Sequence, residues 1–317
     1  MIVSERPAPL IDFHSHYYDP AWFPAQTPSG FSAAFARARA LLTDIDAQLA
    51  AMDTAGVDMK VLSAPLSTLV GPGEAPPVAL SGRINDRFAE LVTAHPDRLL
   101  ALAAIDPFGG DVAAREVERA ITALGLGGIC LDCARGERFL DAPECRPVLE
   151  AAAGLRAPVF VHPVSPAGYT AHLAPHGQVG ILMARGTEAA ASVLSLVRNG
   201  TLNALPSLAV VIPMMSASIL LFAGMLDHEG GRDAPTDPPP SVTIKRLYVD
   251  TMGFDPDTIR FAVATLGADH LLVGSDWPIT PIPTRTRVDG ALAAAGLTAE
   301  ERDAVRGGNA VRLLRRG

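Results

Sequence analysis

Short apolar runs alternate with longer amphipathic stretches along the whole chain. The runs are rich in aliphatic and β-branched residues, which is typical of buried strands, whereas the longer stretches have the mixed polar and apolar pattern of surface helices. The eight strand candidates are "PLIDFHSH", "MKVLSAP", "LLALAAID", "GGICLDC", "PVFVHPV", "LAVVIPMM", "LYVDTMGF" and "LLVGSDWP". The predicted helices cover residues 44–55, 81–94, 112–124, 143–154, 188–199, 257–266 and 298–314.

This alternation predicts repeated βα units and a parallel sheet. Eight such units in 317 residues favour an α/β fold of the (β/α)8 TIM-barrel type, with residues 1–317 forming a single domain. A doubly wound sheet is the alternative, but no G-x-G-x-x-G motif follows the first strand candidate. In a barrel, functional residues gather at the carboxyl ends of the strands. Residues 17–42 and 164–186 are expected to be long loops that form a lid and walls above that rim.

Charge and composition exclude several classes of partner. The formal net charge is −8, and no basic run is present beyond the short "RLLRR" near the end. We therefore expect a small-molecule substrate and neither nucleic acid nor a membrane as partner. The N-terminal segment does not have the pattern of a signal peptide, and Cys130, Cys133 and Cys145 are too few for a disulfide framework. A cytoplasmic location is the expectation.

Two histidines stand one residue apart at the end of the first strand candidate. Residues i and i+2 of a strand face the same side, so His14 and His16 are expected to point together into the barrel mouth. Two ordinary turn histidines are the alternative. His162 ends the fifth candidate and Asp276 ends the eighth, so both project at the same rim. Three imidazoles and one carboxylate leave a position open for water or substrate, as in catalytic metal sites.

These residues resemble those of the amidohydrolase superfamily. The stretches "GICLDCARGERFLDAPECRPVLEAAAGLRAPVFVHP", "LYVDTMGFDP" and "GGNAVRLL" are similar, in particular, to the branch of aminocarboxymuconate semialdehyde decarboxylase and related aromatic acid decarboxylases. The resemblance covers essentially the whole chain. It implies one divalent metal ion, zinc first and manganese second, and a homodimer. The implied metal ligands are His14, His16, His162 and Asp276.

The chain departs from the family at the sixth strand. Family members commonly carry a His-Gly-Gly-Gly sequence there, and its histidine helps to activate the metal-bound water. Met214 occupies that position, and a thioether cannot carry a proton. We therefore hypothesise that His172 or His176, in the long segment after the fifth strand, takes the missing role. Solvated histidines of no function are the alternative.

The resemblance also implies residues that bind the substrate. Arg39, in the segment after the first strand, is the best-placed candidate for holding a substrate carboxylate, with an ordinary surface arginine as the alternative. Gln48 stands where related sequences often have arginine. Asp250 is predicted either to orient a metal ligand or to bind substrate, with simple capping of a turn as the alternative. Trp277, Tyr17, Tyr18 and Phe254 are candidates for an aromatic lining, with simple packing as the alternative, and Met214 is expected to make the rim more apolar.

Three functions are consistent with this site. A bound metal lowers the pKa of its water and polarises a substrate oxygen, and Asp276 is predicted to move the proton. We favour a non-oxidative decarboxylase of a small aromatic or unsaturated carboxylic acid. The first alternative is a hydrolase of an amide, lactone or ester. The second, suggested by Met214, is a catalytically altered barrel that only binds a ligand.

Overall fold

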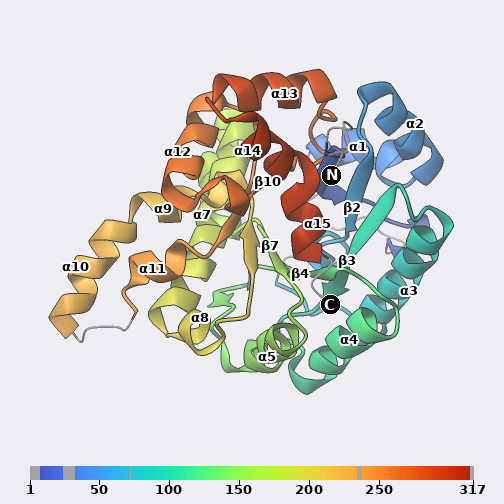
Figure 1. Cartoon of the computed structure of the whole chain (residues 1–317). Coiled ribbons are helices and arrows are strands. Elements are labelled where there is room, and N and C mark those ends of the chain that lie inside the picture. The colour runs from blue at the N-terminus through green and yellow to red at the C-terminus, as the bar shows by residue number, and fades with distance from the viewer. Residues whose placement is uncertain (1–7, 24–32, 72, 234–237, 315–317) are drawn as a thin grey trace.

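The computed structural model describes residues 8–23, 33–71, 73–233 and 238–314. Eight parallel strands form one sheet in chain order, surrounded by helices (Figure 1). The strands are β1 (Ile11–His16), β2 (Met59–Ser63), β3 (Leu99–Ile105), β4 (Gly128–Asp132), β7 (Val159–His162), β8 (Val210–Ile212), β9 (Tyr248–Asp250) and β10 (Leu271–Leu272). A small hairpin, β5 (Ala134–Arg135) and β6 (Arg138–Phe139), follows β4 outside this sheet.

The sheet closes between its last and first strands. Strand β10 has only two residues, but the chain that follows it continues along β1. Phe13 N donates to Val273 O at 2.7 Å, Asp276 N to His14 O at 2.8 Å, and His16 N to Trp277 O at 2.8 Å. The predicted (β/α)8 TIM barrel is confirmed.

Helices follow the strands around the barrel, as the sequence pattern predicts. Most predicted helices are present with ends shifted by a few residues. The helices are α1 (Ala33–Leu42), α2 (Ile45–Ala55), α3 (Val78–Ala94), α4 (Gly110–Thr122), α5 (Arg146–Gly154), α6 (Ala167–Leu173), α7 (Gly177–Arg198), α8 (Thr201–Ala204), α9 (Ser218–Leu221), α10 (Ala223–Asp233), α11 (Pro240–Ile244), α12 (Pro256–Leu266), α13 (Arg285–Ala294), α14 (Ala299–Asp303) and α15 (Asn309–Leu314).

The prediction of long loops is wrong for most of residues 164–186. This segment contains α6 and the first part of α7, which continues to Arg198. Its Gly, Pro and His residues are typical of loops, but small and apolar residues further along bury one side of α7 against the barrel. Helix α1 likewise occupies the second part of 17–42; residues 24–32 lie outside the described residues.

Residues 167–198 are, among the described residues, long and apolar enough to cross a membrane. The mean hydropathy reaches 1.2, and 39% of the most apolar window is buried inside the protein. A core helix of a globular protein meets the same criterion. Here α7 packs against the short 3-10 helix Met214–Ser216 after β8, as part of the helical layer.

Apolar side chains fill the barrel interior below the rim. Phe13 and Phe160 pack edge to face with ring centroids 5.8 Å apart. Leu313 and Leu314 of α15 belong to the same interior cluster, so this helix covers the barrel end opposite the rim. The polar groups at the rim therefore rest on a packed floor that excludes water.

A β-bulge in β1 sets the direction of the first two histidines. The register of β1 on β2 shifts between Asp12 and Ser15. Consecutive residues of a regular strand face opposite sides, yet the rings of Phe13 and His14 both contact Phe160 in the interior. The bulge thus lets β1 add a core residue and a polar residue to the same side.

Candidate metal centre

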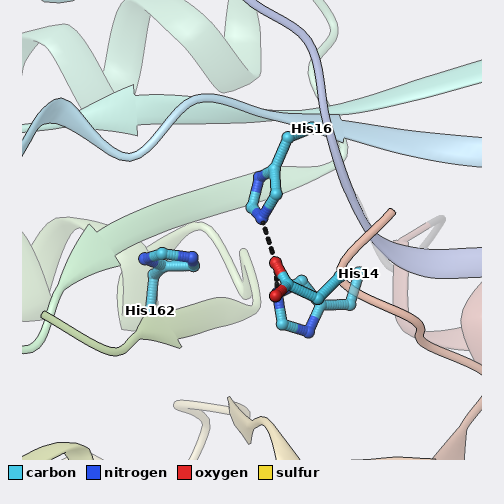
Figure 2. Close-up of side chains that lie close together, drawn as sticks. His14, His16 and His162 are labelled. Atoms are coloured by element: carbon cyan, nitrogen blue, oxygen red, sulfur yellow. Dashed lines mark hydrogen bonds and ion pairs between the residues drawn. The ribbon is translucent and has the colours of Figure 1, made fainter. Parts of the chain in front are cut away.

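The four predicted ligands converge at the rim of the barrel. One candidate ligand atom from each lies within 4.8 Å of all the others, and all four residues are buried. His14 and His16 come from β1, His162 ends β7, and Asp276 lies in the turn after β10 (Figure 2). Asp276 Oδ1 is 3.0 Å from His16 Nε2 and 3.5 Å from His14 Nε2. Two strands and the turn after a third therefore supply one site.

An unusual turn directs Asp276 toward the histidines. Its φ of 66° lies in the left-handed region, which Asp tolerates better than most residues other than Gly. Its backbone N–H donates to His14 O, and its carbonyl accepts from Thr280 N at 3.1 Å. The turn is thus fixed on β1, which carries two of the other candidate ligands.

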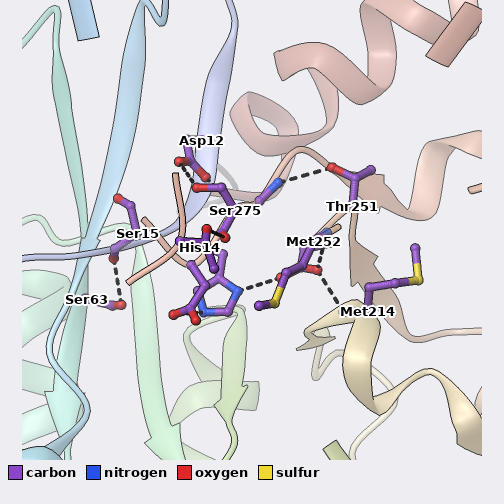
Figure 3. Close-up of polar contacts among 12 residues, drawn as sticks. Asp12, His14, Ser15, Ser63, Met214, Thr251, Met252 and Ser275 are labelled. Atoms are coloured by element: carbon purple, nitrogen blue, oxygen red, sulfur yellow. Dashed lines mark hydrogen bonds and ion pairs between the residues drawn. The ribbon is translucent and has the colours of Figure 1, made fainter. Parts of the chain in front are cut away.

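A buried carboxylate holds the ring of His14 in place. Asp250 Oδ2 is 2.7 Å from His14 Nδ1, and Asp250 Oδ1 accepts hydrogen bonds from Met214 N at 2.7 Å and Met252 N at 3.0 Å (Figure 3). Gly274 lies between the two side chains. A Cβ at position 274 would lie 2.7 Å from the Asp250 Cβ and 2.8 Å from the His14 Cβ. Only glycine allows this approach without a shift of its neighbours.

Burial and neighbouring charges set the protonation of the cluster. Burial lowers the pKa of His16, and it lowers the pKa of His162 well below the usual value. Burial opposes the charged form of His14 too, but the hydrogen bond and charge of Asp250 raise its pKa overall. The pKa of Asp276 is lowered, because the hydrogen bond from His16 and nearby positive charge outweigh burial. Neutral imidazoles and an ionised carboxylate are the forms that bind metals.

The donor set fits a divalent metal ion. His14 Nε2 and His162 Nδ1 are buried and have no hydrogen-bond partner among the described residues. Leaving such nitrogens unsatisfied is costly, and a metal at the centre of the cluster would engage them. Imidazole and carboxylate suit zinc, and manganese also accepts such ligands.

A cavity of about 320 Å³ opens above the cluster. His16, His162 and Asp276 form part of its floor, and its size suits a small molecule. The chain after β2, the β5 region and α7 supply the walls. Wall residues include Tyr18, Leu66, Ser67, Phe108, Asp132, Arg135, Ile181, Leu182, Arg185 and Glu188.

The structure does not bring the predicted proton carriers to the cluster. His172 lies on α6 and His176 on the 3-10 helix Ala174–His176, and both are exposed. Neither belongs to the described residues that line the cavity. Arg39 is also exposed on α1, where its guanidinium lies 4.9 Å from the centroid of the Phe23 ring. Its proposed contact with a substrate carboxylate has no support from this position.

Of the predicted lining residues, Tyr18 lines the cavity, whereas the others pack beside or behind it. Tyr17, Trp277, Met214 and Asp250 are buried and do not line it. The Tyr17 ring packs on Trp22 with centroids 6.1 Å apart, and Met214 offers its backbone N–H to Asp250. The contact of Asp250 with His14 matches the predicted role of orienting a metal ligand.

Trp277 packs on a fully buried lysine. The Lys60 Nζ atom lies 4.8 Å from the Trp277 ring centroid and donates to Gln48 Oε1. Gln48 in turn donates to His16 O at 3.2 Å. Burial lowers the pKa of Lys60 to about 7, although the nearby charge of Asp12 opposes this shift. Gln48 is thus engaged by other protein groups and does not line the cavity.

Sequence reasoning missed the cavity arginines. Arg135 follows β4, and Arg185 lies on α7, in the segment that the sequence pattern assigns to a loop. If a helix is predicted to begin at residue 177, the spacing of Ile181, Leu182 and Arg185 places all three on the same side of that helix. The apolar spacing along 177–198 was the available signal.

Comparisons with known proteins identify similar sequences and similar folds. A family model described as "Amidohydrolase" matches residues 11–316. The chain is 29% identical to a gamma-resorcylate decarboxylase of Rhizobium radiobacter over 262 residues, which cover 76% of this chain and 79% of the relative. It is 26% identical to a 2-amino-3-carboxymuconate-6-semialdehyde decarboxylase of Dictyostelium discoideum, over 86% of this chain and 76% of the relative. A crystal structure of 5-carboxyvanillate decarboxylase from Novosphingobium aromaticivorans with bound manganese has a similar fold, with a TM-score of 0.84, 20% identity and 99% of each chain covered.

Proposed function

The chain belongs to the amidohydrolase family, and on this premise we propose that it is a metal-dependent, non-oxidative decarboxylase of a small aromatic carboxylic acid. The resemblance to the aminocarboxymuconate semialdehyde decarboxylase branch is confirmed by the relatives described above. The observation that carries the proposal is the buried cluster of His14, His16, His162 and Asp276 beside a cavity that suits a small molecule.

The proposed metal is a single zinc ion, with manganese as the second choice. Three imidazoles and one carboxylate are a common zinc set, whereas the relative from Novosphingobium aromaticivorans was crystallised with manganese. Asp132 stands at the end of β4, where binuclear members of the superfamily carry a carboxylated lysine. It accepts hydrogen bonds from Ser67 N at 2.8 Å and Ser67 Oγ at 2.7 Å. A second metal ion is therefore not part of the proposal.

The residues at the cluster are proposed to have different roles in the reaction. A bound metal ion would polarise substrate oxygens and anchor the acid at the floor of the cavity. Asp276 is the proposed proton carrier. The ionised Asp276 carboxylate would take a proton from water in the cavity and deliver it to the ring carbon. The bond from that carbon to the substrate carboxylate then breaks, its electron pair stays on the ring, and carbon dioxide leaves. Asp250 keeps the His14 ring oriented.

The test is carbon dioxide release by protein loaded with zinc or with manganese. Suitable acids are gamma-resorcylate, 5-carboxyvanillate and 6-methylsalicylate, on which named relatives act. The His14→Ala, His16→Ala double variant is the control, and elemental analysis of both proteins gives the metal content. Release by the metal-loaded protein alone supports the proposal. Hydrolysis of an ester, lactone or amide without carbon dioxide release would favour the hydrolase, and binding without turnover the altered barrel.

We also propose a cytoplasmic homodimer. Large apolar side chains are exposed on α7, α9 and the start of α10, among them Met183, Leu221 and Met225. Burying such a surface against a second copy would remove it from water. Light scattering of the eluted protein measures the mass, and a monomer at micromolar concentration would contradict the homodimer.

A further inference from the structure

Arg185 is a cation inside the cavity that holds the candidate metal ligands. It lies on α7, is half-buried, and lines the same cavity as His16, His162 and Asp276. Its hydrogen bond within the described part of the chain joins Nη1 to Ser165 Oγ at 3.3 Å. None of the described carboxylates lies within 4.0 Å of it. Most of its donors are therefore free to bind a ligand.

The second cavity arginine differs in this respect. Arg135 forms an ion pair with Asp106, and its guanidinium also lies 4.9 Å from the centroid of the Phe108 ring. Its charge is thus balanced within the protein. A partly buried guanidinium without a carboxylate partner is costly, and an anion in the cavity would offset this cost.

The charge of Arg185 acts on the metal cluster itself. Burial raises the pKa of Asp276, but the hydrogen bond from His16 and the charges of His14 and His16 lower it overall, and the charge of Arg185 adds to this lowering. Burial and the charge of His16 are the larger causes of the lowered pKa of His162, and the charge of Arg185 adds to them. Both effects indicate that an anion held between the cluster and α7 would be attracted by Arg185 and by a metal ion together.

The reaction determines which anion a cation in this place should hold. A carboxylate that leaves as carbon dioxide loses its charge, so an ion pair with it would be stronger before the reaction than during it. Such a pair would oppose catalysis. An acidic group that stays on the ring keeps its charge, and binding it orients the ring without that penalty. The planar guanidinium matches a carboxylate with two parallel hydrogen bonds.

On the premise of the proposed function, we infer that Arg185 binds a second carboxylate, which the substrate retains, on the α7 side of the ring. The substrate class is then an aromatic dicarboxylic acid, with the retained carboxylate on Arg185 and the reacting side of the ring toward the cluster. Ser165 holds the guanidinium in place through its hydroxyl. The residue sets specificity and does not take part in proton transfer.

The experiment is calorimetric titration of zinc-loaded protein with benzene-1,3-dicarboxylate and with benzoate. We expect the unchanged protein to bind the dicarboxylate at least tenfold more tightly. Arg185→Gln should weaken dicarboxylate binding by about 10- to 100-fold and benzoate binding by less than about twofold. Arg185→Lys should bind the dicarboxylate with intermediate affinity, because lysine keeps the positive charge but cannot donate two parallel hydrogen bonds to a carboxylate. Arg198→Gln is the matched control, since Arg198 is exposed on the same helix.

The binding results test the role of Arg185, and the carbon dioxide assay tests the proposed function. Equal binding of both probes by the unchanged protein overturns it, and so does an equal loss of both in Arg185→Gln. Zinc content and circular dichroism of each variant show whether the fold and the cluster persist. If the carbon dioxide assay succeeds while the probes bind equally, the inference alone fails. If Arg185 discriminates the probes while no acid releases carbon dioxide, the subsite stands and the decarboxylase proposal fails.

Discussion

Asp250 Oδ2 lies 2.7 Å from His14 Nδ1, although β10 and the chain that follows it separate β9 from β1 in the barrel. The contact is fully buried, and the other carboxylate oxygen of Asp250 is held by two backbone N–H groups. A histidine that is fixed in this way presents its second ring nitrogen to a metal in one orientation.

Asp250→Asn should weaken metal binding without unfolding the protein. The amide keeps the shape of the carboxylate but loses its charge, so we expect a 10- to 100-fold increase in the dissociation constant for zinc. Competition with a coloured chelator measures it. Asp111→Asn, an exposed change on α4, is the control and should leave the constant unchanged. Identical constants for Asp250→Asn and the unchanged protein would show that the contact does not support the metal site.

Gly274→Ala should damage both stability and metal binding. The new methyl group would overlap the Cβ atoms of Asp250 and His14, and one of these side chains would have to move. We expect a loss of about 1–3 kcal/mol in the free energy of unfolding together with weaker zinc binding. Gly290→Ala on α13 is the control, because nothing lies within 4 Å of its added Cβ. There we expect a gain of about 0.5–1 kcal/mol in urea unfolding. Equal effects would contradict the close approach at Gly274.

Lys60→Met should change how stability depends on pH. The folded pKa of Lys60 is about 7, against 10.5 for the exposed side chain, because burial disfavours its charge. Between these values the unfolded chain binds the proton and the folded protein does not, so stability rises with pH and is lost as pH falls toward 7. Urea unfolding of the metal-free protein from pH 7 to 10 should show a smaller slope for Lys60→Met.

The second lysine of the chain provides the control for this slope. Lys245 is exposed on the chain after α11, and Lys245→Met should leave the pH dependence unchanged. If both variants reproduce the slope of the unchanged protein, the Lys60 ammonium is not desolvated in solution.

His172→Ala and His176→Ala should leave turnover unchanged. Both imidazoles are exposed and outside the cavity lining, so we expect kcat within about twofold of the unchanged protein and the same pH profile. Steady-state rates from pH 5 to 9 provide the measurement. A tenfold fall in kcat, or a displaced limb of the profile, would instead support the hypothesis that one of them replaces the histidine missing at Met214.

The sequence predicts the cluster well because strand ends are local features. His162 and Asp276 follow apolar runs directly, and the ends of parallel strands must meet at one rim. The cavity walls depend on longer-range packing. Arg39 and His172 lie on helices that turn them toward solvent, and no pattern in the chain shows those directions. The bulge after Asp12 is equally hidden, since the alternation of a regular strand would place Phe13 and His14 on opposite sides.

The closure of the barrel has a consequence for local stability. The last strand contributes only two residues, so the junction of β10 with β1 rests on a few backbone hydrogen bonds from the following turn. His14 and His16 lie on one side of this junction and Asp276 on the other. A metal ion shared by them would cross-link the junction, so removing it should speed hydrogen exchange of the Phe13 and His16 amides before that of the β3 and β4 amides. Occupancy of the active centre would thus also determine how often the barrel opens.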